Sequence, residues 1–335
     1  MDKPKWVTMK DVADRANVGK ITVSRVIRTP EKVSQETRRR VEDVIRELGY
    51  VPDETAGALS SNRSRVIGAL VSTLSDSVFA STIEGLSRTL RQSGYELLLS
   101  KTDYEPELET AAIRTLLGRR PDGLVLSSTD HTDSALKLLA SSGVPVVEIW
   151  QLPDHPIDHV VGFSNYHAGR TVTDYLIQSS RQRIAFIGTS RAGDRRGKRR
   201  AEGYRDALMN SGLGEALYID GDLSFSSDAD IGASGFAQAL TRWPDLDAVV
   251  CVSDPVAMGA ICEASRRGIQ IPGQMAITGF GGLELARESA LNLTTIEFPG
   301  QKIGKVAAEI LVDPEQNERK NIVDLGFNLV RRGTA

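Results

Sequence analysis

The sequence of 335 residues contains no apolar run of about 18 or more residues, so it has no segment with the length and hydrophobicity of a membrane-spanning helix. Its first five residues, MDKPK, also lack the apolar stretch of a secretory signal. We therefore expect a cytoplasmic protein with no membrane partner.

Cysteine is scarce in the sequence, and the histidines are scattered. Cys251 and Cys262 are too few for a metal site, and a reducing cytosol would keep both as thiols, so we expect both to be core residues. The four histidines lack the spacing of zinc ligands, and we expect them at the surface or on a cleft wall: His131, His155, His159 and His167.

Catalytic motifs are missing as well. No Gly-x-Ser-x-Gly sequence indicates an activated serine. The run Gly279-Phe280-Gly281-Gly282 matches neither a dinucleotide fingerprint nor a phosphate-binding loop, so we interpret it as a tight turn at a strand end. The sequence predicts no catalytic residue, no metal and no cofactor, and hence a protein that is not an enzyme.

Charge is present but unevenly distributed. Residues 1–65 carry 14 basic against 10 acidic side chains, whereas the remaining residues carry 27 against 34. A basic N-terminal segment suits contact with the phosphates of a nucleic acid. An excess this small gives weak binding, so we expect dimerisation to double the contacts.

Residues 9–28, MKDVADRANVGKITVSRVIR, have the pattern of two short helices joined by a tight turn. Thr8 is a suitable N-cap, and Asp11 three residues later completes a capping box. Asn17-Val18-Gly19 interrupts the helical pattern, and we expect Gly19 to adopt backbone angles that other residues avoid.

The second of these helices has distinct inner and outer faces. Val23, Val26 and Ile27 recur at three- and four-residue spacing and should face the first helix. In a helix lying in the major groove, Arg25 can form two hydrogen bonds with guanine, and Ile21 can contact a thymine methyl. The predicted DNA contacts in this region are Thr8, Lys20, Ile21, Thr22, Ser24, Arg25 and Arg28. An ordinary helical hairpin with a solvated basic face is the alternative.

A third helix is predicted after Ser34, a further N-cap, and Gly49 is placed to end it. The runs DVADRANVGKITVSRVI, VSQETRRRVEDVIRELGYVPD and ALSSNRSRVIG resemble those of the LacI family of bacterial repressors, and the resemblance covers the whole chain. Within that family the chain is most similar to the gluconate-type repressors, with Lys20 at the first base-reading position and a closing DLGF segment. The resemblance implies a helix-turn-helix headpiece over residues 1–50.

Residues 51–65 form a short, polar, weakly helical segment that we interpret as a hinge. The resemblance places Leu59 where a hinge helix of the family inserts a leucine into the minor groove and kinks the operator. A flexible linker, with Leu59 packed on the core, is the alternative.

Residues 66–335 alternate short apolar runs with amphipathic segments, which predicts an α/β core of parallel sheets covered by helices on both faces. The resemblance implies the two-lobe fold of periplasmic sugar-binding proteins. The expected lobes are about 66–161 with 293–324, and 162–292 with 325–335, joined by crossovers near residues 161, 292 and 324.

A ligand in such a fold binds beyond the C-terminal ends of the strands. Six of the ten residues in 191–200 are basic, and we predict that they form a loop between a strand at 183–189 and a helix that begins at residue 200. A charge run is usually solvated surface, but its position at the sheet edge favours a ligand contact. The resemblance places an effector-binding arginine at Arg200 or a near neighbour.

The chain departs from the family at Gly281, where an aspartate usually binds sugar hydroxyls. Losing a carboxylate while keeping several arginines favours an anionic ligand. Phe79, Trp150 and Phe225 are predicted as apolar walls, although each could equally be core. The remaining predicted effector residues are Asn165, Arg195, Arg196, Arg200, Ser253, Asp254 and Gly281.

Together these features predict a homodimeric transcription repressor that binds a palindromic double-stranded DNA operator, with gluconate or a related sugar acid acting as inducer. A sugar phosphate is the alternative effector. Two rivals are a plain solute-binding protein, which needs an export signal and no headpiece, and a sugar-acid enzyme, which needs a nucleophile beside a base. No heptad run follows Arg332, which favours a dimer over a tetramer.

Overall fold

The computed structural model describes residues 6–52, 63–74, 77–189, 191, 193–224, 227–287, 292–313, 315 and 320–335. The chain divides into two compact units, Met1–Ser64 and Arg65–Ala335, and each has a hydrophobic core of its own. Leu59 and Phe225, predicted to contact DNA and the effector, lie outside the described residues.

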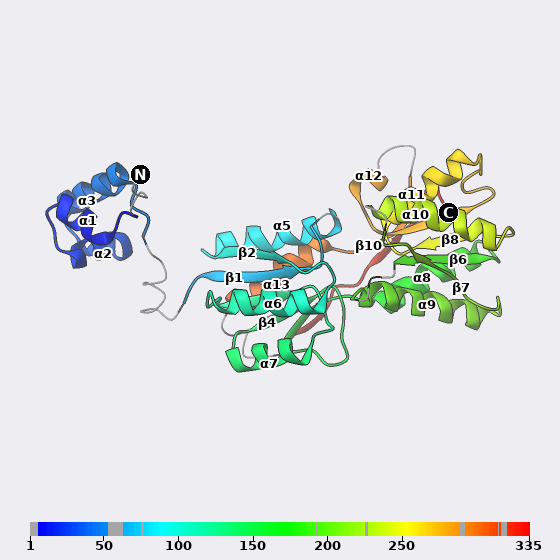
Figure 1. Ribbon diagram of the computed structural model, residues 1–335, viewed down its shortest axis with the longest axis horizontal. Helices are drawn as coiled ribbons and strands as arrows, with labels where there is room; N and C mark the ends of the chain where they lie inside the picture. The colour runs from blue at the N-terminus through cyan, green and yellow to red at the C-terminus, as the bar shows by residue number, and fades with distance from the viewer. Residues whose placement is uncertain are drawn as a thin grey trace. The chain divides into compact units, whose positions relative to one another are not determined.

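The described residues of the first unit form three α-helices and one short 3-10 helix (Figure 1): α1 (Met9–Arg15), α2 (Lys20–Arg28), η1 (Pro30–Lys32) and α3 (Gln35–Leu48). The predicted capping box is confirmed, because the Thr8 hydroxyl accepts from the backbone N–H of Asp11, whose carboxylate accepts from the N–H of Thr8. Ser34 caps α3, and Gly49 ends it in the left-handed conformation. These helices close around valines and alanines at helical spacing.

The turn between α1 and α2 differs from the sequence-based expectation. Gly19 has a φ of −74°, which any residue can adopt, whereas Asn17 has a φ of 51°. Asparagine tolerates this left-handed region because its short side chain can hydrogen-bond locally. The prediction for Gly19 is therefore wrong, and Asn17 makes the turn.

The second unit contains two six-stranded sheets. All strands of the first sheet run parallel, in the order β11-β5-β4-β3-β1-β2. Helices α5 (Ser77–Gln92) and α13 (Gly300–Val312) pack together on one face, and α6 (Pro106–Leu117) and α7 (Asp133–Ser142) cover the other (Figure 1). We call this sheet with these helices the first lobe. Its strands are β1 (Val66–Val71), β2 (Glu96–Lys101), β3 (Gly123–Leu126), β4 (Val146–Ile149), β5 (His159–Gly162) and β11 (Ile322–Asp324).

The second sheet has the order β12-β10-β9-β8-β6-β7, and only its edge strand β12 runs antiparallel to its neighbour. Helices α8 (Asn165–Gln178) and α9 (Arg195–Ser211) pack as one pair, and α10 (Asp228–Arg242) and α11 (Asp254–Arg266) as another, on opposite sides of the sheet (Figure 1). With α12 (Glu284–Arg287) they form the second lobe. Its strands are β6 (Ile184–Thr189), β7 (Leu217–Gly221), β8 (Ala248–Cys251), β9 (Ala276–Gly281), β10 (Thr294–Glu297) and β12 (Asn328–Val330).

The chain passes between the lobes three times: after β5, after β10, and between β11 and β12. The first and third passages follow the expected crossovers near residues 161 and 324 closely. The second does not, because β10 pairs with β9 and so keeps residues 294–297 in the second lobe. The crossover expected near residue 292 therefore comes after residue 297.

Helices α8 and α9 approach each other closely at two glycines. A Cβ at Gly169 would lie 2.1 Å from the carbonyl oxygen of Arg200, and a Cβ at Gly203 would lie 2.0 Å from that of Tyr166. Any larger side chain would push the helices apart. The close packing therefore fixes the part of α9 that carries Arg200. None of the helices in the described part of the chain is long and apolar enough to cross a membrane.

Candidate functional site

Helix α2 presents the predicted DNA-contacting face. Val23 and Val26 are buried, whereas Lys20, Arg25 and Arg28 are exposed, and Ile21 is 70% exposed, which is unusual for a large apolar side chain. Thr22 and Ser24 are partly buried on the same helix. An exposed isoleucine flanked by basic and hydroxyl groups is suited to reading base edges.

The charges of the headpiece are arranged so that α2 is purely basic. Its sequence, KITVSRVIR, contains no acidic residue. Ion pairs in the described headpiece connect side chains of α1 and α3 instead: Arg15 with Glu47, Arg38 with Glu42, and Arg46 with Asp43. Lys20 and Arg25 are exposed on this helix, where they can contact a phosphate or a base edge. Thr8 uses its hydroxyl in the cap of α1.

A second candidate site is a cleft between the two lobes with about 540 Å³ of space, part of it open to solvent. The cleft lies at the C-terminal ends of the strands, as the βαβ pattern predicted. Its lining residues are Phe79, Tyr104, Trp150, Phe163, Thr189, Arg191, Asp194, Arg196, Arg200, Asp228, Val252, Ser253, Phe280 and Phe298.

The arginines of the cleft come from helix α9 and the segment before it. We expected a basic loop up to residue 200, but α9 begins at Arg195, and Asp194 caps it by accepting from the N–H of Gly197. In an α-helix, residues four apart share a face. Arg196 and Arg200 therefore both line the cleft, while the side chain of Arg195 is half exposed and lies 3.7 Å from Asp130.

Arg196 connects the two lobes and is only 9% exposed. Its guanidinium donates to the carbonyl oxygen of Ser127 and lies 3.4 Å from the hydroxyl of Ser72, both in the first lobe. It also lies 5.5 Å from the ring of Phe79 and 5.3 Å from that of Trp150. In the described part of the cleft, the hydrogen-bond acceptors of this buried cation are thus uncharged.

Arg200 is held by the second lobe itself. It donates to the amide oxygen of Asn165 at 2.9 Å and to the carbonyl oxygen of Val252 at 2.7 Å, and it lies over the ring of Phe280 at 3.5 Å. Arg191 pairs with Asp228 at 2.6 Å. Burial would lower the pKa of Arg191, but the hydrogen bond and charge of Asp228 raise it, so the group stays charged.

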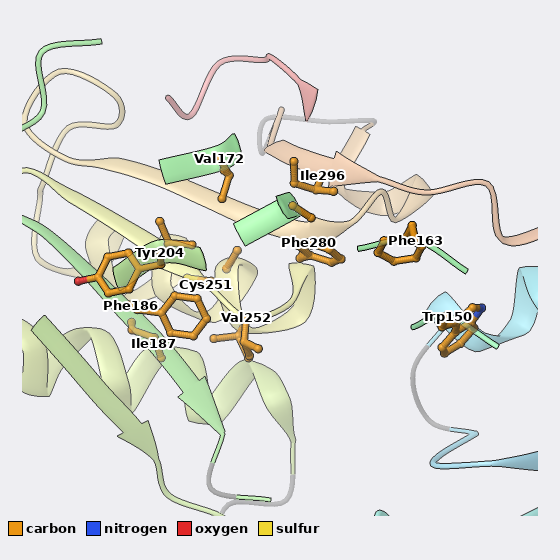
Figure 2. Packing of buried hydrophobic residues seen from close by; sticks show 14 of the residues in the cluster. Trp150, Phe163, Val172, Phe186, Ile187, Tyr204, Cys251, Val252, Phe280 and Ile296 are labelled. Carbon is orange, nitrogen blue, oxygen red and sulfur yellow. The ribbon is translucent and has the colours of Figure 1, made fainter. Parts of the chain in front are cut away.

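Aromatic rings close the side of the cleft nearest the lobe junction. The ring centroid of Phe163 lies 4.9 Å from that of Phe298 and 6.2 Å from that of Phe280. Figure 2 shows Phe163 beside Phe280. Trp150 lies 4.0 Å from Phe79, and its indole N–H donates to the hydroxyl of Thr82. Trp150 has a φ of 73°, a costly conformation for a bulky residue and one that is enriched at functional sites.

Five of the predicted effector residues line the cleft, and four described ones do not. The lining ones are Phe79, Trp150, Arg196, Arg200 and Ser253. Asn165 is fully buried behind Arg200, and Asp254 is fully buried, accepting from Thr295 and from the N–H of Leu283. Gly281 lies in β9 opposite Glu297, and Arg195 lies at the rim.

Several lining residues were missed because they lie outside the predicted strand-end loops that carry charge. Tyr104 follows β2, where its ring lies 5.2 Å from the guanidinium of Arg191. Phe163 and Phe298 lie at the first two lobe crossovers, and Asp228 starts α10. An aromatic residue within three positions of a strand end was the available signal for Tyr104 and Phe163.

Two expectations about polar residues are wrong. Cys251 is buried, where burial raises its pKa, but Cys262 is exposed on α11. His131 and His159 are buried rather than on the surface or a cleft wall, and burial lowers the pKa of His159. Across the described residues, no group of three His, Cys, Asp or Glu side chains is placed to hold a metal ion.

Comparisons with known proteins agree with both halves of this architecture. Residues 8–53 match the family described as "Bacterial regulatory proteins, lacI family", and residues 64–326 match "Periplasmic binding proteins and sugar binding domain of LacI family". The chain is 34% identical to the HTH-type transcriptional regulator GntR of Escherichia coli strain K12, with 99% of each chain covered. It is 31% identical to the regulator IdnR of the same strain, with 98% of each covered.

Solved structures give the same result. A LacI-family transcriptional regulator from Silicibacter pomeroyi has a TM-score of 0.90 at 32% identity, covering 98% of this chain and 99% of that one. The lac repressor dimer bound to operator has a TM-score of 0.83 at 25% identity, covering 98% and 99%. With a helix-turn-helix unit, a two-lobe ligand cleft and full-length relatives above 30% identity, this chain belongs to the LacI family of bacterial transcription regulators.

Proposed function

We propose that this protein is a transcription repressor that binds a palindromic operator as a homodimer and is released from it by a small anionic sugar derivative. Gluconate or a related sugar acid is the proposed inducer, and a sugar phosphate is the second candidate. Membership of a repressor family and the purely basic α2 support the DNA-binding half of the proposal.

The main support for an anionic ligand is the environment of Arg196. Its guanidinium is nearly buried, yet the acceptors it reaches are a carbonyl and a hydroxyl rather than a carboxylate. A buried charge is costly when no opposite charge compensates it. A ligand carboxylate or phosphate in the cleft would supply that charge and accept two parallel hydrogen bonds from the guanidinium.

The rest of the cleft suits a polyhydroxylated chain. Thr189 and Ser253 line the cleft with hydroxyl groups, and it is also lined by Asp194, which caps α9, and by Asp228, which pairs with Arg191. The aromatic rings supply apolar contact for the carbon chain. Among the described residues, the cleft therefore combines the buried Arg196, whose acceptors are uncharged, with several neutral or acidic hydrogen-bond partners, which fits an aldonic acid better than a neutral sugar.

The ligand proposal is tested by calorimetric titration with gluconate, glucose and 6-phosphogluconate. We expect binding of at least one anion and much weaker binding of glucose. Arg196→Gln should weaken anion binding by a factor of 10 or more, since a charge-assisted hydrogen bond contributes about 1.5–3 kcal/mol. Arg195→Gln, one residue away at the rim, is the matched control. Glucose binding as tightly as either anion would refute the anionic ligand.

Induction needs a separate measurement, because ligand binding alone does not show whether the ligand lowers or raises the affinity for the operator. Operator affinity should fall when gluconate is added, since an inducer must bind the lobe arrangement that binds DNA poorly. A fluorescence-anisotropy titration with and without gluconate measures this effect. Tighter DNA binding with gluconate would make the ligand a co-repressor.

Two exposed sheet edges support the dimer. Strands β2 and β7 lie at the ends of the two sheets, and β2 exposes Leu98 and Leu99 while β7 exposes Tyr218. Apolar side chains on an open edge favour pairing with a second chain. Leu98→Glu with Leu99→Glu should shift the protein to monomer in analytical ultracentrifugation. Leu108→Glu, which alters an exposed leucine of α6, should not.

A further inference from the structure

The first lobe contains a buried histidine between two buried glutamates. The side chains of His131, Glu109 and Glu148 are 4%, 5% and 1% exposed. The Nδ1 atom of His131 lies 2.5 Å from a carboxylate oxygen of Glu109, and its Nε2 atom lies 3.5 Å from one of Glu148. This arrangement is outside the cleft lining, and the proposed function does not use it.

The three side chains connect elements that are distant in sequence. Glu109 comes from α6, Glu148 from β4, and His131 from the segment between β3 and α7. Glu148 also accepts from the N–H of Ile157, on the connection leading to β5. Beside the cluster, the hydroxyls of Thr110 and Thr132 lie 2.8 Å apart, which joins the same helix and segment a second time.

The segment that His131 ends is one of the parts of the first lobe that the arginines of α9 reach. Arg196 donates to the carbonyl oxygen of Ser127, and Arg195 lies 3.7 Å from Asp130. The hydroxyl of Ser128 holds the turn between them, accepting from the N–H of Asp130. Residues 127–130, which we call the docking segment, are thus fixed at one end by β3 and at the other by His131.

The charges explain why His131 can act as this anchor. The charged groups that face its imidazole are Glu109 from α6 and Glu148 from β4. An imidazolium donates from both nitrogens and compensates the two carboxylates, whereas a neutral imidazole has one donor only. Deprotonation would leave two buried carboxylates with one donor between them, which favours opening of the cluster.

We propose that His131 is a positioning residue: its imidazolium, clamped between Glu109 and Glu148, holds the docking segment where Arg196 binds it, so that loss of this charge releases Arg196 and loosens the contact between the lobes. The proposal concerns the protein without ligand, and it does not depend on the identity of the effector. The geometry makes the cluster a fixed structural charge at neutral pH, and alkaline titration is the means of testing it.

Trp150 offers a local probe, because its ring lies 5.3 Å from the guanidinium of Arg196. Replacing the other two tryptophans, by Trp6→Phe and Trp243→Phe, leaves Trp150 as the sole tryptophan of the full-length chain. Burial lowers the pKa of His131, but its hydrogen bond to Glu109 and the charges of Glu109 and Glu148 outweigh burial and raise the pKa to about 9. We expect the Trp150 emission to shift to longer wavelength with a midpoint near pH 9.

Three variants in this background decide the cause of the shift. His131→Gln should abolish the pH step. Arg196→Gln should also abolish it, because this change removes the contact that the Trp150 emission reports. His167→Gln, at an exposed histidine of α8, should leave it unchanged. A flat emission profile between about pH 8 and pH 10, or a step that survives His131→Gln, would overturn the proposal.

Direct observation of the imidazoles covers the case in which His131→Gln fails to fold. NMR of the histidine-labelled full chain should show one of the four histidines titrating near pH 9, at the midpoint of the Trp150 shift. If all four titrate below about pH 7.5, or if the midpoints of imidazole and tryptophan differ clearly, His131 does not position the docking segment.

Discussion

At the scale of single residues, the partners of a side chain decide its role more than its type does. Arg191 pairs with Asp228, Arg200 is held by Asn165 and the carbonyl of Val252, and Arg196 reaches uncharged acceptors across the lobes. All three line the same cleft. Arg196 is nearly buried, and the acceptors it reaches in the other lobe are uncharged, so we expect an anion to stabilise it most and its loss to matter most for ligand binding.

Arg25 is expected to give sequence specificity to DNA binding. Arg25→Ala should cost on the order of 1–3 kcal/mol per half-site on the operator and relax the preference at one base pair, because a bidentate contact to guanine is lost. Fluorescence anisotropy on operator and random DNA measures the difference. Arg38→Ala on α3 is the control, and it should weaken both DNAs alike. An equal loss on both DNAs for Arg25→Ala would contradict the prediction.

His131 should also give the folded protein a characteristic pH dependence. Its pKa is raised on folding from an ordinary 6.5 to about 9, so its contribution to stability is fully present below about pH 6.5 and is lost as the pH rises through about 9. The free energy of unfolding of the wild type should therefore fall towards that of His131→Gln over this range in urea titrations. His167→Gln should remain parallel to the wild type. A constant difference between wild type and His131→Gln would contradict the linkage.

The sequence allowed correct predictions for residues whose role depends on their neighbours in sequence. It did not for residues whose role depends on tertiary contacts. The caps at Thr8 and Ser34 were predictable because a cap depends on the next three residues. The burial of His131 depends on α6 and β4, which are 22 and 17 residues away in sequence. No local pattern records that meeting, so a surface position was the default.

At the scale of elements, the start of α9 changes the interpretation of the basic run. If residues 191–200 formed a loop, no arginine would be favoured over another as a contact to the cleft. As a helix from Arg195, the basic residues divide into a cleft face with Arg196 and Arg200 and an outer face with Arg195, Lys198 and Arg199, while Arg191 lines the cleft from the segment before the helix. The helix was placed too late because glycine and consecutive charges weaken the apolar periodicity on which such predictions depend.

The crossing of α8 and α9 gives a prediction at this scale. Gly169→Ala should destabilise the protein by about 1–3 kcal/mol, because the added methyl would collide with the backbone of Arg200 at 2.1 Å. The same change should weaken ligand binding by displacing Arg200. Urea unfolding and calorimetry measure both effects.

A control for this prediction is Gly273→Ala in the same unit. The nearest atoms to its added methyl are 3.8 Å away, so a change within about 0.5 kcal/mol is expected. If Gly169→Ala proved as harmless as Gly273→Ala, the two helices would have room to separate, and the position of Arg200 would not depend on their contact.

At the scale of the whole molecule, composition and periodicity predicted a helical unit followed by an α/β core, the lobe boundary near residue 292 was wrong, and the predicted hinge at 51–65 lies largely outside the described residues. The failure at residues 292–297 has a simple cause: β10 is a short strand directly before a crossover, so its sequence shows that it is a strand but not which sheet it joins. Pairing partners in parallel sheets are set by the whole chain, not by neighbours in sequence.

The division of the chain predicts that the second unit folds without the first. A fragment of residues 65–335 should unfold cooperatively in urea at nearly the midpoint of the full chain's second unit, because its core contains no residue of the headpiece. The fragment should bind the same ligands and lose operator binding. An unfolded or strongly destabilised fragment would show that the headpiece contributes to the core.

The order in which the chain builds its units also determines which parts of this protein can be exchanged between relatives. The DNA-reading unit is one uninterrupted stretch of the gene, so a single splice near residue 64 would transplant a new operator preference without altering the cleft. Each lobe, by contrast, is assembled from segments separated by three crossovers, so no single splice can replace a lobe. Recombination can therefore reassign which promoter such a protein serves far more easily than which molecule it senses.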